Sequence, residues 1–359
     1  MWRRQRIVGP DGPALLPPST PRRVCLILLS GIGDAVHGLP LALDLKRLDP
    51  PVHVTWVAEP APAQILAHHA AVDRVVVFRP RDGARGVWRL ARAMSGTSAH
   101  VTLNLQRYLK SAWPTLFSGA PVRVGLPPSK TRDGIRRLHT HVLRDGPWKH
   151  TQDLFLDFRW ALGVDRDAPV AWGLTLSPEE EEKHRAWIEA LGAGPVAALV
   201  VASANPKKDW IPERYAALAD ALERDLGFRV ILLAGPSPRE GNALARILHA
   251  ASTRPVDART ASVRTLMGRL KGSALVVAPD TGPLHLAHAM GVPVVGLFGH
   301  TNPWRVGPWR EFRDLVVDRY TEPGAAPDAS AYLPRDGRME AITVGDVLEK
   351  VELARCRYL

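Results

Sequence analysis

Short apolar runs alternate with amphipathic segments along most of the 359-residue chain. Runs of about four to eight apolar residues bounded by turn residues are typical of buried strands. In the first half we expect strands at residues 24–29, 52–57, 75–78, 101–105 and 122–125, with helices between them. Strands that alternate with helices predict a parallel sheet covered on both faces.

The second half repeats this alternation, with strands predicted at residues 196–201, 230–234, 274–278 and 292–298. Ser177 and Glu180 have the spacing of a capping box, which indicates the start of a helix. Two α/β halves of similar size predict two Rossmann-like domains with parallel sheets.

The breaks in this pattern predict the domain boundaries. We expect an irregular N-terminal extension, an N-terminal domain, a C-terminal domain and a terminal helix that packs back on the N-terminal domain; these are residues 1–21, 22–165, 174–340 and 341–359. Residues 127–150 are rich in Lys and Arg and interrupt the alternation, so we expect a long irregular loop that is functional or mobile.

A βαβ unit at residues 274–308 contains the strongest local signal. Its two apolar runs flank the turn Asp280-Thr281-Gly282 and a short helix that ends at Gly291. Free N–H groups at a helix N-terminus favour anions, which predicts a phosphate-bearing ligand at Thr281 and Gly282. The alternative is a tight turn with a capped helix. His285 could orient a sugar or phosphate, or face the neighbouring domain.

Three other turns follow predicted strands, at the sheet edge where open α/β sheets bind ligands. Asp34 ends a Gly31-Ile32-Gly33-Asp34 turn and is either a general base or a helix cap, and spacing favours the cap. Lys208 could neutralise a diphosphate or belong to a solvated basic turn. Glu240 could bind ribose hydroxyls, although spacing favours an acid in the first turn of a helix.

Composition narrows the function class less than these turns do. The net charge of +11 indicates an acidic partner or a surface rich in Arg, and composition does not separate the two. Two cysteines without metal or disulfide spacing indicate a reducing compartment. We find no signal-peptide segment, membrane-spanning run, metal cluster or nucleophilic triad in the sequence.

Several motifs together resemble those of bacterial glycosyltransferases of family 9, the ADP-heptose:lipopolysaccharide heptosyltransferases. They read D-T-G-P-L-H-L-A-H-A-M-G-V-P-V-V-G-L-F-G-H-T-N-P from residue 280, S-G-I-G-D-A-V-H-G-L-P-L from residue 30, N-L-Q-R-Y-L-K-S-A-W from residue 104 and K-D-W from residue 208. The similarity covers about residues 22–320. Two departures are Ala204, where a second hydroxyl is sometimes found, and His300, which replaces a common proline.

The resemblance implies a GT-B fold, with two Rossmann-like domains that face across a cleft. It also implies an inverting, metal-independent transfer with no cofactor, in which the nucleotide-sugar, here ADP-heptose, is a co-substrate. The donor is expected on the C-terminal domain. The acceptor, an acidic glycan or a lipid-linked molecule, is expected on the N-terminal domain.

The resemblance also implies roles for individual residues. Asp34 matches the proposed base. Donor contacts are expected from Ser203, Lys208, Glu240, Asp280, Thr281, Gly282 and His285. The charge of the basic loop, and not the resemblance, makes Lys130, Arg132, Arg136 and Arg137 candidate acceptor contacts, together with Gly33; the alternative is a flexible solvated loop. We further expect a cytoplasmic monomer that contacts the inner membrane peripherally and binds no nucleic acid.

Three other functions stay open at this point. A non-hydrolysing nucleotide-sugar epimerase shares the two-domain layout. A member of the family could glycosylate a small molecule. A nucleic-acid-binding protein would explain the charge, but the sequence lacks the basic-aromatic motifs of RNA-binding domains.

Overall fold

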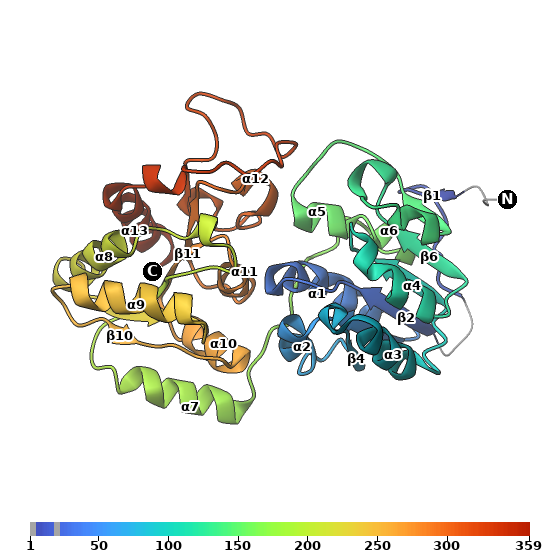
Figure 1. Ribbon diagram of the computed structural model, residues 1–359, viewed down its shortest axis with the longest axis horizontal. Coiled ribbons are helices and arrows are strands. Elements are labelled where there is room, and N and C mark those ends of the chain that lie inside the picture. The colour runs from blue at the N-terminus through green and yellow to red at the C-terminus, as the bar shows by residue number, and fades with distance from the viewer. Residues whose placement is uncertain (1–4, 18–21) are drawn as a thin grey trace. The chain divides into compact units, whose positions relative to one another are not determined.

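A computed structural model describes residues 5–17 and 22–359. Internal contacts divide the chain into two units, which are described separately. The N-terminal unit contains the described residues up to Pro147, together with Thr151–Gly173. The C-terminal unit contains Trp148–His150 and Leu174–Leu359. Each unit holds one parallel sheet with helices on its faces (Figure 1).

The N-terminal unit has a seven-stranded parallel sheet in the order β1-β7-β6-β5-β2-β3-β4. Its strands are β1 (Arg6–Val8), β2 (Arg22–Ile27), β3 (Val52–Ala58), β4 (Arg74–Val77), β5 (Val101–Asn104), β6 (Val122–Gly125) and β7 (His141–Leu143). In the interior strand β2, Leu26 is in register with Trp56 of β3 on one side and Leu103 of β5 on the other. The five predicted strands are present, and central strands buried on both faces explain why their sequences are continuously apolar.

Two strands of this sheet lie where we expected irregular chain. β1 falls within the predicted N-terminal extension, of which residues 1–4 and 18–21 lie outside the described residues. β7 lies within residues 127–150, which also form the 3₁₀ turns η3 (Pro128–Lys130) and η4 (Ile135–Leu138). Both strands have three residues, too few to display a hydrophobic period, and they extend the sheet beyond β6.

Helices cover both faces of this sheet. They are α1 (Ile32–Arg47), α2 (Pro60–Leu66), α3 (Gly83–Met94), α4 (Ala112–Phe117), α5 (Thr151–Leu156) and α6 (Arg159–Leu162). Cys25 and Ile27 of β2 pack in a cluster with Leu90 of α3, and α3 contacts α4. Leu28, the residue after the end of β2, packs against α1. A Cβ added to Gly38 of α1 would lie 2.9 Å from the Leu28 side chain. Glycine therefore lets α1 approach the sheet closely.

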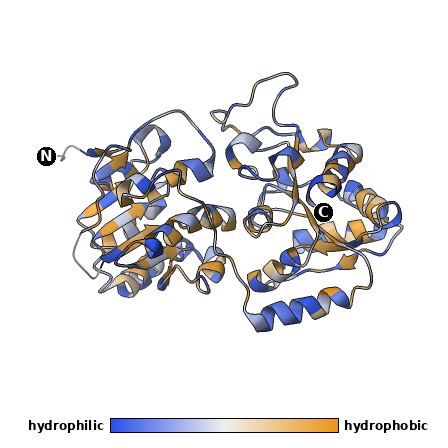
Figure 2. Cartoon of the chain, turned by 180° about the vertical axis from the view of Figure 1, so that it is seen from behind, coloured by the Kyte–Doolittle hydropathy of each residue, from blue (hydrophilic) through white to orange (hydrophobic). Residues whose placement is uncertain are grey.

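The C-terminal unit has a six-stranded parallel sheet in the order β10-β9-β8-β11-β12-β13. Its strands are β8 (Val196–Val200), β9 (Arg229–Leu233), β10 (Val256–Asp257), β11 (Leu275–Pro279), β12 (Val294–Phe298) and β13 (Val316–Asp318). The four predicted strands are present. The edge strands β10 and β13 were not predicted, because two or three residues give no readable pattern. Hydrophobic residues concentrate on the strands of both sheets (Figure 2).

Two groups of helices pack around this second sheet. The helices are α7 (Pro178–Glu189), α8 (Pro212–Arg224), α9 (Pro238–Ala250), α10 (Val263–Lys271), α11 (Gly282–Ala289), α12 (Pro303–Val306) and α13 (Val344–Tyr358). One group is α8, α9 and α13, and the other is α7, α10 and α11. The terminal helix α13 belongs to the C-terminal unit, where it contacts α8, β12 and β13, whereas we had expected it on the N-terminal domain.

Candidate functional site

In each sheet, the strands that follow the first long strand are added first on one side of it and then on the other. β2 lies between β5 and β3 in the N-terminal unit, and β8 lies between β11 and β9 in the C-terminal unit. Ligands of open α/β sheets bind outside the carboxyl ends of the strands at such a switch point. The loops after β8 and β11, and those after β2 and β5, are therefore the candidate ligand loops.

In the C-terminal unit, Asp280 joins these two loops. Lys208 Nζ, from the loop after β8, lies 2.6 Å from Asp280 Oδ2. Thr301 Oγ1 donates to the same oxygen at 2.8 Å, and His285 Nε2 lies 3.5 Å from Oδ1. Burial by itself raises the pKa of Asp280, but the His285 contact and the Lys208 charge outweigh it and hold that pKa below its ordinary value. Asp280 is therefore an ionised anchor for the lysine.

Thr281 and Gly282 form the start of helix α11. Thr281 is the N-cap residue in an extended conformation, but its side chain makes no capping hydrogen bond. Its Oγ1 is buried and has no hydrogen-bond partner among the described residues. Buried hydroxyl groups are nearly always hydrogen-bonded, so this one is available to a ligand at the helix N-terminus. The alternative of a side-chain-capped turn is not what the structure contains.

Ser203 shapes the loop that carries Lys208. Its Oγ lies 2.6 Å from the carbonyl oxygen of Asn205 and 2.8 Å from Asp209 Oδ1, and its backbone N–H donates to the same Oδ1 at 2.6 Å. The Arg239 guanidinium, from the first turn of α9, contacts both the Asp209 carboxylate and the Ser203 carbonyl oxygen. Arg239 was missed at the sequence level, because an arginine beside a predicted helix start carries no distinguishing signal.

Glu240 caps its own helix. Ser237 Oγ donates to Glu240 Oε2 at 2.7 Å, and the Glu240 N–H lies 3.3 Å from Ser237 Oγ. This is a capping box at the start of α9. The same carboxylate folds over Gly235, where an added Cβ would come within 2.7 Å of Oε2. The helix-acid interpretation, which spacing favoured, describes this geometry, and a contact with ribose stays a prediction.

Two buried histidines, one on α11 and one in the segment before α5, donate to backbone carbonyl groups that follow β12. His288 Nε2 donates to the Trp309 carbonyl oxygen at 2.9 Å, and His150 Nε2 donates to the Gly307 carbonyl oxygen at 2.9 Å. Burial lowers the pKa of His288 to about 4 and that of His150 to about 3, so both are neutral near pH 7. His150 was missed as a neighbour of this helix, because residues 127–150 looked like a continuous loop of the first domain.

The segment around residues 323–334, which has no counterpart in the family motifs, is tied to the end of β12. Asn302 Nδ2 donates to the carbonyl oxygens of Asp328 and Ala331, at 2.7 Å each. Asn302 also caps α12 by accepting from the Trp304 N–H at 3.0 Å. One side chain thus ties this segment to the loop whose preceding residue, Thr301, bonds to the Asp280 carboxylate.

In the N-terminal unit, Asp34 lies in the first turn of α1. The N-cap of this helix is Gly31, whose φ of 86° favours glycine, so Asp34 is not the N-cap that its spacing suggested. The carboxylate folds back over Gly31: a Cβ added there would lie 3.3 Å from Asp34 Oδ2. The buried Gly33 separates the two residues along the helix start. An acidic side chain at this position is stabilised by the helix dipole.

Lys110 reaches the loop that carries Asp34. Its Nζ lies 2.5 Å from Ser30 Oγ and 3.0 Å from Glu59 Oε1. The loop of Lys110, after β5, is held by Asn104, whose Nδ2 lies 3.0 Å from Ser111 Oγ and whose Oδ1 accepts from the Gln106 N–H at 3.0 Å. The sequence motif from residue 104 contained Lys110, but nothing in the motif separated this lysine from its neighbours.

The predicted acceptor residues do not share one environment. Lys130 is buried, and its Nζ donates to the Gly146 carbonyl oxygen at 2.6 Å, so it ties its own loop together and is not a surface cation. Arg132, Arg136 and Arg137 are exposed near the 3₁₀ turn η4. Lys130 differs from the three arginines in exposure because the end of its own loop, at Gly146, covers it.

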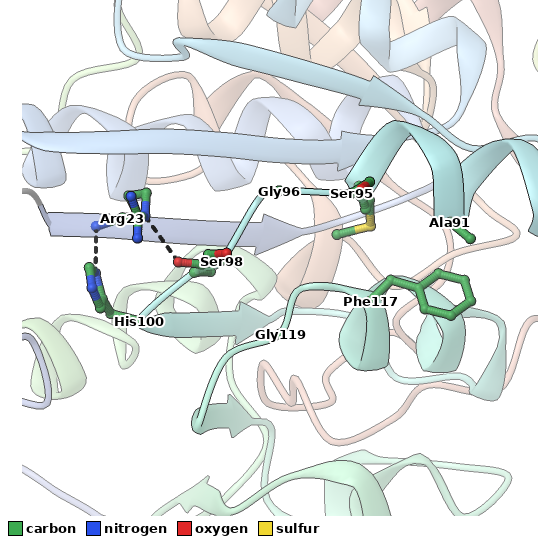
Figure 3. A pocket seen from close by; sticks show the side chains of 10 residues that line it. Arg23, Ala91, Ser95, Gly96, Ser98, His100, Phe117 and Gly119 are labelled. Carbon is green, nitrogen blue, oxygen red and sulfur yellow. Dashed lines mark hydrogen bonds between the residues drawn. The ribbon is translucent and has the colours of Figure 1, made fainter.

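A cavity of about 570 Å³ lies at the amino edge of the N-terminal sheet, opposite the edge that carries the candidate ligand loops (Figure 3). Arg23, His100 and Gly119 line it near the amino ends of β2, β5 and β6. Arg23 Nε donates to the Ser98 carbonyl oxygen at 3.0 Å, and the Arg23 N–H donates to His100 Nδ1 at 3.1 Å. None of the predicted site residues lines this cavity.

The described residues contain neither a metal-binding cluster nor a membrane-spanning helix. Across residues 5–17 and 22–359, no three His, Cys, Asp or Glu side chains are grouped so that they could hold a metal ion. Within the same part of the chain, no helix combines the length and apolar character needed to cross a membrane.

Comparisons with known proteins agree with this architecture. The model of glycosyltransferase family 9 (heptosyltransferase) matches residues 87–325, more than half of the chain. The lipopolysaccharide core heptosyltransferase OpsX of Haemophilus influenzae is 25% identical over 84% of this chain and 86% of its own. Solved structures with the same fold include a family 9 glycosyltransferase from Veillonella parvula, with a TM-score of 0.76 and 21% identity over 92% of this chain and 96% of that one. Another is Escherichia coli heptosyltransferase WaaC with ADP, with a TM-score of 0.72 and 22% identity over 92% of this chain and 99% of that one.

Proposed function

Because the chain belongs to glycosyltransferase family 9, we propose that it transfers a heptose from ADP-heptose to a hydroxyl group of a lipopolysaccharide-core or related glycan acceptor. The chain is a glycosyltransferase of the GT-B fold. The observation that carries the donor assignment is the Lys208–Asp280 pair beside the N-terminus of α11, at the switch point of the C-terminal sheet.

We propose that this pair and the helix N-terminus bind the donor diphosphate. Lys208 supplies a positive charge that Asp280 holds in place at 2.6 Å. The Thr281 hydroxyl and the first N–H groups of α11 supply hydrogen-bond donors, and Ser203 and His285 border the same loops. Donors fixed before the reaction stabilise the charge that develops on a leaving diphosphate. In other transferases a metal ion stabilises this charge. The protein donors can do so here, which supports a metal-independent transfer.

The reaction is a single displacement with inversion. Asp34 takes the proton of the acceptor hydroxyl, the acceptor oxygen forms a bond to the anomeric carbon, and the bond from that carbon to the phosphate oxygen breaks. ADP leaves with the bonding electron pair on its terminal phosphate. Asp34 lies in the first turn of α1, where the helix dipole stabilises an acidic side chain.

The acceptor is an acidic glycan carried on a lipid, and the exposed Arg132, Arg136 and Arg137 are its proposed contacts together with Gly33. Lys130 is not included, because it is buried within its loop. We infer that the enzyme acts as a monomer and meets a lipid-linked acceptor at the cytoplasmic face of the inner membrane.

The donor assignment is tested by thermal shift with ADP-, UDP-, GDP- and TDP-sugars, since a ligand that binds only the folded state raises its stability. We expect ADP-heptose to give the largest shift, and transfer to persist in EDTA. A larger shift with another nucleotide would replace ADP. An epimer formed from the donor without acceptor would favour the epimerase alternative.

The base assignment is tested separately with Asp34→Asn. We expect transfer to fall by about 10²- to 10⁴-fold while donor affinity, measured by calorimetry, stays unchanged. Transfer near the wild-type rate in a folded Asp34→Asn protein would remove Asp34 from this role.

A further inference from the structure

We propose that helices α3 and α4 of the N-terminal unit form a docking surface for an anionic lipid bilayer. This inference deepens the proposed function, because it assigns the membrane contact to a surface, and it does not depend on which sugar is transferred. It begins with the distribution of exposed apolar side chains. Trp88 on α3 is 62% exposed and Trp113 on α4 is 46% exposed, and they are the only exposed tryptophans among the described residues.

Other large apolar side chains are exposed on the same segment. They are Tyr108, Leu109 and Leu116, so residues 79–119 supply five of the twelve exposed large hydrophobic residues in the described part of the chain. Helices α3 and α4 contact each other and share a core cluster that faces the sheet, through Leu90 and Phe117 (Figure 1). Because both helices cover one face of the sheet, the side chains that they expose point away from that face.

The helical pattern of α3 keeps its two faces distinct. Gly86, Leu90 and Met94 are buried, whereas Trp88 lies on the exposed side with arginines one turn away. The Arg92 guanidinium lies 5.8 Å from the centre of the Trp88 ring. On α4, Trp113 stacks against Phe117, with ring centres 5.7 Å apart. Exposed aromatic rings that are held in place by a neighbouring side chain are enriched at the interface between lipid and water.

Charge identifies the partner that this surface fits. Residues 79–119 contain seven basic residues and one acidic residue; the basic ones are Arg79, Arg81, Arg85, Arg89, Arg92, Arg107 and Lys110, and the acid is Asp82. Asp82 pairs with Arg89 at 2.8 Å, and Lys110 pairs with Glu59 at 3.0 Å, so neither of these two basic residues adds to the excess charge. Arg85 and Arg92 are exposed and form no salt bridge with any described residue. Clustered arginines are attracted to anionic lipid head groups, and their long side chains reach the head groups while the tryptophan rings insert.

The same surface adjoins the loop after β5. Tyr108 and Leu109 are exposed there, immediately before Lys110, which contacts the Ser30 hydroxyl next to the Asp34 turn. Resting on the proposed function, this arrangement would present a lipid-linked acceptor to the N-terminal unit from the bilayer surface. The docking surface itself requires only the exposed aromatic rings and the unbalanced positive charge.

The experiment measures co-sedimentation of the full chain with vesicles of phosphatidylcholine alone and with an equal mixture of phosphatidylcholine and phosphatidylglycerol. We expect binding to the mixture only, weakened at high salt because salt screens the arginines. Trp88→Ala/Trp113→Ala and Arg85→Glu/Arg92→Glu should each lose at least about tenfold in binding. Their melting temperatures and transfer to a soluble, lipid-free acceptor should stay close to wild type.

The matched control is Lys183→Glu/Arg224→Glu, two exposed basic residues of the C-terminal unit whose reversal changes the net charge equally. It should keep vesicle binding within about twofold, since these positions lie outside the surface. Equal losses in both charge-reversal proteins, or equal binding to both kinds of vesicle, would overturn the proposal. Preferential binding to a short DNA duplex with a steep salt dependence would assign the surface to nucleic acid instead. Because vesicle binding needs no sugar donor, its failure is distinguishable from failure of heptosyl transfer.

Discussion

Lys208 and Asp280 are 72 positions apart in the sequence, yet Lys208 Nζ lies 2.6 Å from Asp280 Oδ2. The parallel pairing of β8 with β11 brings their loops together at the carboxyl edge of the sheet. The N-terminal unit repeats the arrangement, because Lys110 of the loop after β5 contacts Ser30 of the loop after β2. In each unit a lysine therefore bridges the two loops at the point where the strand order reverses.

Replacing Lys208 should weaken catalysis far more than replacing its neighbour. For Lys208→Met we expect kcat/KM to fall by about 10²- to 10³-fold, because one preorganised cation is lost from the diphosphate site. Lys207→Met is the matched control: Lys207 points to the exposed Asp336, at 2.6 Å, and should stay within about twofold of wild type. Steady-state kinetics with varied donor measures both. Similar losses in the two variants would argue that the loop acts only through its net charge.

Thr281→Val should separate stability from donor binding. The Thr281 Oγ1 atom is buried without a partner in the described structure, so removing it should leave the melting temperature unchanged or slightly raised. If the hydroxyl donates to the donor diphosphate, donor affinity should fall by about tenfold, the effect of losing one hydrogen bond to a charged group. Calorimetric titration with the nucleotide-sugar measures the affinity, and Thr281→Ser should restore it. An unchanged affinity in Thr281→Val would remove this hydroxyl from the site.

Gly31→Ala should reduce both stability and transfer. Gly31 has a φ of 86°, and an L-residue in this region costs about 1–2 kcal/mol. A new methyl group would also press on the Asp34 carboxylate, which lies 3.3 Å from that position. Displacing a base by about an ångström lowers the rate by up to about 10²-fold.

The control for this glycine is Gly96→Ala. Gly96 also has a positive φ, of 77°, but an added Cβ would meet no atom within 4 Å. We expect a similar loss of stability in urea unfolding and a normal rate of transfer. If both glycine variants lost transfer in proportion to stability, the contact between Gly31 and Asp34 would have no special role.

The ionised state of Asp280 predicts the pH dependence of stability. Its pKa is lower in the folded protein than in the unfolded chain, so its contribution is complete above the ordinary Asp pKa of about 4 and is lost as the pH falls through the lower folded value. Asp280→Asn should therefore lower the free energy of unfolding by about 1–3 kcal/mol at neutral pH. The difference from wild type should shrink in strong acid. A difference that persists unchanged to low pH would show that charge is not its cause.

The sequence by itself determined the alternation of strands and helices. The predicted strands in both units are continuous apolar runs, because the centre of a parallel sheet is buried on both faces and this requirement is visible locally. The turns at Asp280–Gly282 and Gly31–Asp34 were also recognisable as strand-to-helix connections, because each is a short stretch between an apolar run and a helical pattern. The family resemblance, the fold and the glycosyltransferase class followed from these motifs and were confirmed.

Only the tertiary structure decided which polar side chains meet. Lys110 and Lys130 look equivalent in the sequence, but Lys110 reaches the Ser30 hydroxyl while Lys130 is buried against the Gly146 carbonyl oxygen. The three-residue strands β1 and β7 were invisible for a related reason. Three residues carry no period, and the pairing of these two strands joins positions far apart in the chain, such as Arg6 and His141. Contacts between distant segments depend on sheet order, and no local pattern of hydrophobic and polar residues records that order.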